Sequence, residues 1–311
     1  MTVTAKATID ILRRRLAERF AKSVYGYTTP QFATEPTCFA LLALSRTLTT
    51  SSMEDHLRVL MSCQRSDGFW PAVDRDSGPG VWATAVAANT LVEFSPADRA
   101  LRLGIRALLD ANPQEAHWLY RLRFRTTDTH VRFDPDKYGW GWVPGTISWV
   151  IPTAMALIAL QRSRTRDLFP AKDLEGRLDF AYAMLFDRMC PGGGWNAGNS
   201  VVYNVALVPH IDASAIAVAA LRKHWRSSEV ERSLSWLVSA NCSSAYSLAW
   251  RILALRSYLD IRPDFRAVTE VAREQLTNLL EDPVQSAETT TLALSILALR
   301  DDMNPLALEP A

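Results

Sequence analysis

The sequence predicts an all-α fold, a closed double ring of six inner and six outer helices (an α6/α6 toroid). The first observation is a segment rich in alanine and leucine that recurs six times along the chain and aligns without a gap. These segments are apolar nearly all round, which is typical of helices buried on both sides. The second observation is that stretches of mixed charge and leucine alternate with them. An open solenoid would require polar capping repeats, and the sequence shows none.

The six apolar segments are the expected inner helices. Proline at the second position of two of them fits a first helical turn, where the missing N–H costs little. The segments cover residues 35–44, 82–91, 151–160, 212–221, 246–255 and 288–297. One aligned position of the repeat holds Thr37, Thr84, Thr153, Ser214, Leu248 and Thr290.

The expected outer helices are amphipathic. In one of them Val230, Leu234 and Leu237 recur at helical spacing, and glutamate and arginine fill the other face. The six stretches are 9–22, 53–64, 96–110, 173–188, 229–240 and 265–280. The longest connection, 112–148, is expected to be functional because long loops in compact domains usually are.

The composition restricts the classes of function. The 311 residues show no shift in composition, so a single domain over 1–311 is expected, and a net charge of +1 gives no reason to expect nucleic acid as a partner. The four cysteines form no CxxC pair, which argues against a zinc site or a disulfide framework. The chain begins without a signal-peptide pattern and has no apolar run long enough to span a bilayer, so we expect a soluble, cytoplasmic protein.

The segment QRSDGFW at 64–70 resembles the QW repeat of squalene–hopene and oxidosqualene cyclases. The fragments YGWGW at 138–142 and PGGGWN at 191–196 look like degenerate copies of it. Through its repeats the whole chain resembles the superfamily of terpene cyclases and protein prenyltransferase β-subunits. Glycine permits a tight turn, and tryptophan and glutamine can tie that turn to the next repeat. We therefore predict structural roles for Trp70 and Trp195.

Proton-initiated cyclases of this superfamily carry an acidic segment, such as DxDD, just before an inner helix. The segment HIDAS at 210–214 matches it only at the central, proton-donating aspartate. The resemblance therefore implies Asp212 as the catalytic acid, with His210 as its neighbour and tuning group. A carboxyl that faces an apolar cavity favours its neutral form. The alternative is that Asp212 caps its helix, since Glu35 and Glu288 occupy the same position of the repeat.

Aromatic residues at the starts of the inner helices are the expected ligand contacts. They could stabilise a carbocation, at about 0.5–2 kcal/mol for each cation–π contact, or they could simply fill the ring. The expected substrate-binding residues are Trp82, Trp149, Tyr246, Trp250, Phe39, Glu35 and Glu288. The arginine-rich segment YRLRFR at 120–125 is either an anion clamp or a solvated surface.

The leading hypothesis is a terpene cyclase-like enzyme of class II that cyclises a linear isoprenoid in a central apolar cavity. No metal or cofactor is expected, except Mg²⁺ if the substrate carries a diphosphate. The alternative is a non-catalytic toroid that binds an isoprenoid or a partner protein, and a glycosidase with two opposed carboxylates is a third possibility. A zinc-dependent prenyltransferase is disfavoured because the segment 212–214 lacks the thiolate ligand. Substrate length, product and oligomeric state stay open.

Overall fold

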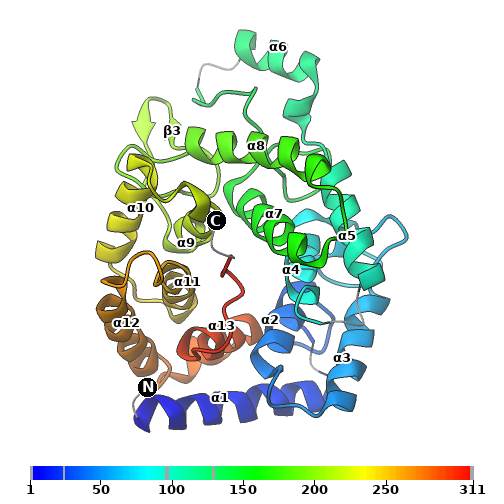
Figure 1. Ribbon diagram of the computed structural model, residues 1–311, viewed down its shortest axis with the longest axis vertical. Helices are drawn as coiled ribbons and strands as arrows, with labels where there is room; N and C mark the ends of the chain where they lie inside the picture. The colour runs from blue at the N-terminus through cyan, green and yellow to red at the C-terminus, as the bar shows by residue number, and fades with distance from the viewer. Residues whose placement is uncertain (1–2, 24, 95–97, 128–129, 309–311) are drawn as a thin grey trace.

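The inner ring is made by the six apolar segments, each of which folds as one α-helix. The computed structural model describes residues 3–23, 25–94, 98–127 and 130–308. The inner helices are α2 (Thr34–Leu44), α4 (Val81–Leu91), α7 (Val150–Ser163), α9 (Ile211–Ala220), α11 (Ala245–Arg256) and α13 (Thr289–Leu299). Each packs against the next in this order, and α13 packs against α2, which closes the ring (Figure 1). The predicted toroid is confirmed, and the open solenoid is excluded.

The outer ring follows the amphipathic stretches. Its helices are α1 (Val3–Ala21), α3 (Thr50–Ser62), α5 (Asp98–Asp110), α8 (Ala171–Asp187), α10 (Ser228–Ser239) and α12 (Phe265–Leu279). Each predicted boundary lies within a few residues of the observed one, except at the start of α1. Every described residue of α4 and α13 is buried, whereas the outer helices bury one face only. No described helix is both long and apolar enough to cross a membrane.

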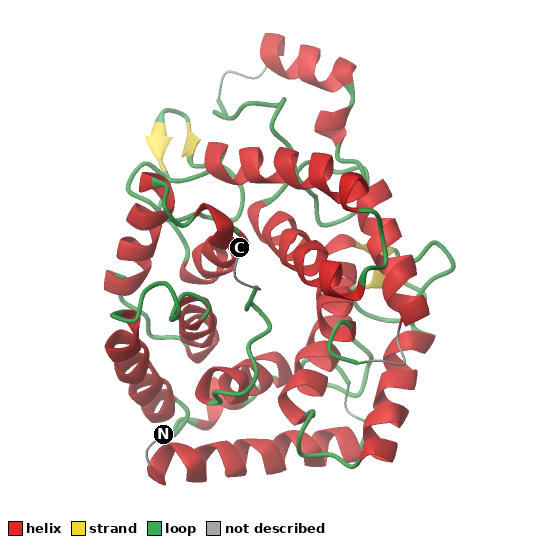
Figure 2. Ribbon diagram, in the orientation of Figure 1, coloured by secondary structure: helices red, strands yellow, loops and turns green. Residues whose placement is uncertain are grey.

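The long connection between α5 and α7 contains a helix that the sequence did not predict. This helix, α6 (Trp118–Thr127), projects from the ring (Figure 1). Two short antiparallel hairpins complete the fold, as Figure 2 shows. They pair β1 (Trp70–Pro71) with β2 (Pro79–Gly80), and β3 (Val201–Val202) with β4 (Val205–Ala206).

The tryptophans of the three QW-like segments make the same two bonds. The indole N–H of Trp70 donates to the carbonyl of Leu60 at 2.9 Å, and its backbone N–H donates to the hydroxyl of Thr84 at 2.9 Å. Together the two bonds join an outer helix, α3, to the inner helix that follows it, α4. The equivalent partners are Leu108 and Thr153 for Trp140, and Leu185 and Ser214 for Trp195. The structural roles predicted for Trp70 and Trp195 are thus confirmed, and the aligned hydroxyl of the repeat is their acceptor.

The remaining residues of QRSDGFW tie the turn to the next repeat. Gln64 donates to the carbonyl of Gly68 at 2.9 Å and to that of Ala100, in α5, at 3.0 Å. Gly68 has a φ of +87°, and a Cβ there would lie 2.6 Å from the carbonyl oxygen of Leu103. Only glycine fits this conformation and this close approach without a shift.

The segment after α13 crosses the middle of the ring at the end where the inner helices terminate (Figure 1). Asn304 donates to the carbonyl of Leu253 at 2.9 Å, and Asn89 donates to the carbonyl of Pro305 at 3.0 Å. Leu306 is fully buried. The segment therefore covers this end of the ring, and the end where the inner helices begin is the place to look for a site.

Candidate functional site

Tyr246, in the first turn of α11, is the centre of a cluster of acidic residues. Burial raises the pKa of its phenol well above the usual value, and the charges of Glu35, Asp212 and Glu288 raise it further. These carboxyls come from the starts of α2, α9 and α13. The structure therefore brings together four of the residues that the sequence selected, from four of the six inner helices.

Glu35 is the carboxyl of the three that accepts hydrogen bonds from the side chains of other segments. Its Oε2 accepts a hydrogen bond from the indole N–H of Trp82 at 3.1 Å and another from the hydroxyl of Tyr27 at 3.0 Å. Trp82 lies in α4, and Tyr27 precedes α2, so the carboxyl connects two elements at the rim of the ring. Both donors bind the same oxygen, and Oε1 makes no hydrogen bond with any described residue.

Burial raises the pKa of Glu35 to about 7, although the hydrogen bonds from Trp82 and Tyr27 act in the opposite direction. The negative charge of Glu288 adds to the rise. Near neutral pH a large fraction of the Glu35 carboxyl is therefore protonated, whereas an ordinary glutamic acid would be almost fully ionised. Perturbed carboxyls of this kind are candidates for acid–base roles.

Aromatic side chains extend from this cluster into the interior of the toroid. Tyr246 contacts Trp250 edge to face, with ring centroids 6.3 Å apart, and Trp250 contacts Phe39 in the same way at 5.4 Å. Trp250 and Phe39 are fully buried. Because they come from α11 and α2, which are not adjacent in the ring, their contact fills the interior below the acidic cluster.

Asp212 and His210 line an open pocket of about 530 Å³ between the starts of α9 and α11. Asp212 is half-buried and His210 is exposed, and no hydrogen bond or ion pair joins them in the described structure. The half-buried Cys242 lines the same pocket, and burial raises the pKa of its thiol. The roles predicted for Asp212 and His210 therefore stay predictions.

The acidic residues that share one position of the repeat differ in whether they cap their helices. Glu288 is the N-cap of α13, and its carboxyl accepts from the backbone N–H groups of Thr290 and Thr291. The N-cap of α9 is His210, without a capping hydrogen bond from its side chain. The capping interpretation is thus wrong for Asp212, which lies inside the first turn, and correct for Glu288.

Two residues of the cluster were missed by the sequence analysis. Tyr27 lies in the loop before α2 and carries no recognisable pattern. Trp142 belongs to YGWGW, and it packs on Trp82 with ring centroids 5.9 Å apart. Trp149 is the N-cap of α7 and lies close to Gly198, with no aromatic contact to Trp82 or Tyr246 in the described structure.

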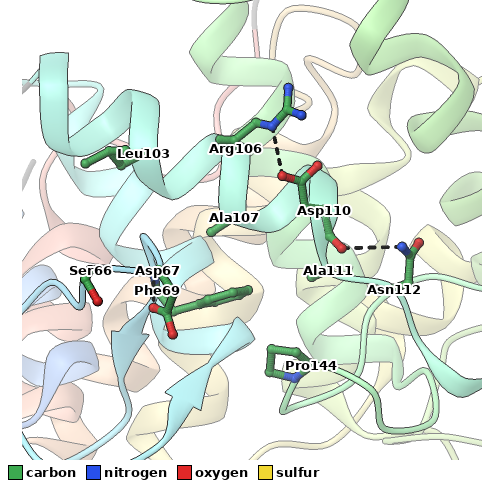
Figure 3. Close-up of a pocket in the computed structure, with 10 residues that line it drawn as sticks. All are labelled: Ser66, Asp67, Phe69, Leu103, Arg106, Ala107, Asp110, Ala111, Asn112 and Pro144. Atoms are coloured by element: carbon green, nitrogen blue, oxygen red, sulfur yellow. Dashed lines mark hydrogen bonds and ion pairs between the residues drawn. The ribbon is translucent and has the colours of Figure 1, made fainter.

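Other features of the described surface do not resemble a catalytic site. A hollow of about 390 Å³ lies outside the ring beside α5, with the ion pair of Arg106 and Asp110 at its rim (Figure 3). In the arginine-rich segment of α6, Arg121 and Arg125 both pair with Asp136. No group of three metal-ligating side chains with suitable geometry occurs in the ranges that the structure describes.

No protein-family model and no curated protein matches the chain. Among solved structures, the apo form of the type II terpene cyclase MstE from Scytonema matches with a TM-score of 0.56. The identity is 14%, over 89% of this chain and 80% of that chain. The fold is terpene cyclase-like. At this identity the likeness of the toroid concerns architecture alone.

A Salmonella alpha-2-macroglobulin reacted with methylamine matches with a TM-score of 0.49 and 16% identity. The match covers 95% of this chain but 18% of that chain.

Proposed function

We propose that this toroid binds a linear isoprenoid at the end where the inner helices begin, and that Glu35 starts carbocation chemistry by protonating an alkene. The observation that carries the proposal is the Glu35 carboxyl, with two donors on Oε2 and none on Oε1. The terpene cyclase-like fold supports the class of substrate.

The proton would reside on Oε1. In the first step the π electrons of the alkene form a C–H bond with this proton, and the O–H electrons remain on Glu35 as a carboxylate. The positive charge on the adjacent carbon is then attacked by a second alkene of the same chain, which closes a ring. Loss of a proton from the product cation to a base ends the reaction, so that the net change is an isomerisation.

The raised pKa has two opposite effects on this step. It keeps the proton on Glu35 at neutral pH, but it also makes the carboxyl a weaker acid, by about 1.4 kcal/mol for each pH unit. The hydrogen bonds from Tyr27 and Trp82 favour the developing carboxylate and already limit the rise of the pKa to about 7. The faces of Trp82, Tyr246 and Trp250 are the nearby groups able to stabilise the cation.

A second candidate function is binding of an isoprenoid or a partner protein without turnover. The contact between Phe39 and Trp250 favours it, because these buried rings occupy the interior where a long substrate would need to lie. The two candidates differ in whether a ligand that binds at this end is changed chemically.

The test is incubation of the purified protein with farnesyl diphosphate, geranylgeranyl diphosphate and squalene, followed by mass spectrometry of the products. The variants are Glu35→Gln, Tyr27→Phe and Asp212→Asn. Glutamine keeps the oxygen that accepts both hydrogen bonds but has no acidic proton. We expect no cyclic product from Glu35→Gln, and a rate lower by roughly 10²-fold for Tyr27→Phe, which loses one donor to the developing carboxylate.

Cyclic product that persists in Glu35→Gln and disappears in Asp212→Asn would transfer the acid role to Asp212, as the sequence first suggested. Absence of product from the wild type with all three substrates, together with measurable binding, would favour the non-catalytic toroid. Folding of each variant is checked by its far-UV circular dichroism.

A further inference from the structure

A basic pocket of about 820 Å³ lies at the opposite end of the ring, where α4 and α7 terminate. Four cationic side chains contribute to its wall: Arg162, Arg164, Arg166 and Lys223. The segment after α13 supplies part of its apolar wall through Leu308. Since the inner helices are 10 to 14 residues long, the pocket is about 15–20 Å from the Glu35 cluster.

Two of these cations are neutralised by the protein itself. Arg162 pairs with Glu93 and also donates to the side-chain oxygen of Asn89 at 2.6 Å. Arg166 pairs with Asp98 at 3.1 Å. These two arginines therefore have structural partners near the carbonyl ends of the inner helices, where positive charge is favourable.

The other two cations, Arg164 and Lys223, have no such partner. Arg164 is exposed in the turn Arg164–Arg166 after α7, and Lys223 lies in the turn Arg222–His224 after α9. Neither forms an ion pair or donates a side-chain hydrogen bond within the part of the chain that the structure describes.

The two cations line the same pocket from the turns that follow α7 and α9. Burial lowers the pKa of Lys223, the carboxylate of Asp179 on α8 opposes this decrease, and the positive charge of Arg164 adds to it by a smaller amount. The ammonium of Lys223 is held 4.0 Å above the centre of the Tyr182 ring. Since neither side chain forms an ion pair with a described carboxylate, a multivalent anion placed between them would gain a direct charge–charge contact with both.

We propose that this pocket binds a diphosphate between Arg164 and Lys223. The apolar wall formed by Val92, Ala307 and Leu308 would lie beside a hydrocarbon chain attached to that diphosphate. The ligand is accordingly a free diphosphate or the diphosphate end of an isoprenoid. The site is separate from the Glu35 cluster and does not depend on the acid role proposed there.

Calorimetric titration of the full chain with sodium pyrophosphate and with farnesyl diphosphate, each at low and high ionic strength, tests the proposal. The test variant is Arg164→Gln/Lys223→Gln, and the matched control is Arg58→Gln/Arg106→Gln, which removes the same charge from exposed positions on α3 and α5. We expect pyrophosphate to bind the wild type and the control alike. The test variant should bind at least tenfold more weakly, and high salt should weaken binding in all proteins.

No pyrophosphate binding by the wild type at low ionic strength, or equal binding by the test variant, would overturn the proposal. An equal loss of affinity in the control would also overturn the proposal, because it would show that binding depends on the net charge of the protein and not on these two side chains. Farnesyl diphosphate that binds the wild type more tightly than pyrophosphate, and binds the test variant more weakly, identifies an isoprenoid ligand of this pocket. Equal affinity of the wild type for the two, lost in the test variant, identifies a free diphosphate, and both results support the site. Glu35→Gln should bind pyrophosphate as the wild type does, so failure of the acid proposal and failure of this one are distinguishable.

Discussion

Replacing Glu35 by glutamine should remove a pH-dependent penalty from the free energy of unfolding. The carboxyl has an ordinary pKa of 4.5 in the unfolded chain and a pKa of about 7 in the fold. A rise of this size corresponds to about 3 kcal/mol, at about 1.4 kcal/mol per pH unit.

The direction of the pH dependence follows from which state of the protein, folded or unfolded, loses the Glu35 proton first. Below about pH 4.5 both states hold the proton, and the contribution of Glu35 to stability is fully present. As pH rises toward 7 the unfolded chain ionises first, so stability is lost progressively, and above pH 7 the loss is complete. The glutamine variant has no proton to lose, so its stability relative to the wild type should increase over this range.

Urea unfolding followed by tryptophan fluorescence, from about pH 5 to about pH 8, measures this difference. We expect the stability of Glu35→Gln minus that of the wild type to grow by about 2–3 kcal/mol across the range. The matched control is Glu274→Gln, which alters an exposed carboxyl on α12, and its difference should stay constant within about 0.5 kcal/mol. A constant difference for Glu35→Gln as well would refute the assignment of a raised pKa to this group.

Two further matched pairs of variants test the packing of the repeat, with unfolding free energies as the measurement. Thr84→Val leaves the buried N–H of Trp70 without its acceptor and should cost about 1–3 kcal/mol. Thr290→Val should change stability by less than about 0.5 kcal/mol, because the Thr290 hydroxyl has no partner among the described residues; equal costs would contradict this reasoning. Gly104→Ala places a Cβ 2.8 Å from the Trp70 ring and should cost about 1–3 kcal/mol, whereas Gly176→Ala, in open space on α8, should stabilise by up to about 1 kcal/mol. Similar effects in both glycine variants would show that the ring of Trp70 does not limit the approach of α5.

The architecture could be predicted because its signals are local. Segments that are apolar on all sides become inner helices, and segments with one apolar face become outer helices, because every apolar face of a helix must be buried. The turn that joins them is equally local, because QRSDGFW combines a glycine that tolerates positive φ with a tryptophan that reaches back to Leu60. The sequence analysis did not predict helix α6, because this helix lies outside the ring, where no periodic apolar face is required.

The candidate site could be predicted only in part. The sequence marked Glu35, Asp212 and Glu288 as equivalent, because they share one position of the repeat. It could not assign them different chemistry, since that depends on donors from other segments.

The sequence by itself determined the ring and the end of it where polar residues collect. Only the tertiary structure decided that the pKa of Glu35 is raised, because it buries this carboxyl near Glu288 although Tyr27 and Trp82 donate to it, and it placed Asp212 at an open pocket. The physical reason is that a pKa depends on burial and on nearby charges and donors in space. The two donors are 8 and 47 residues away along the chain, a separation that no local pattern encodes.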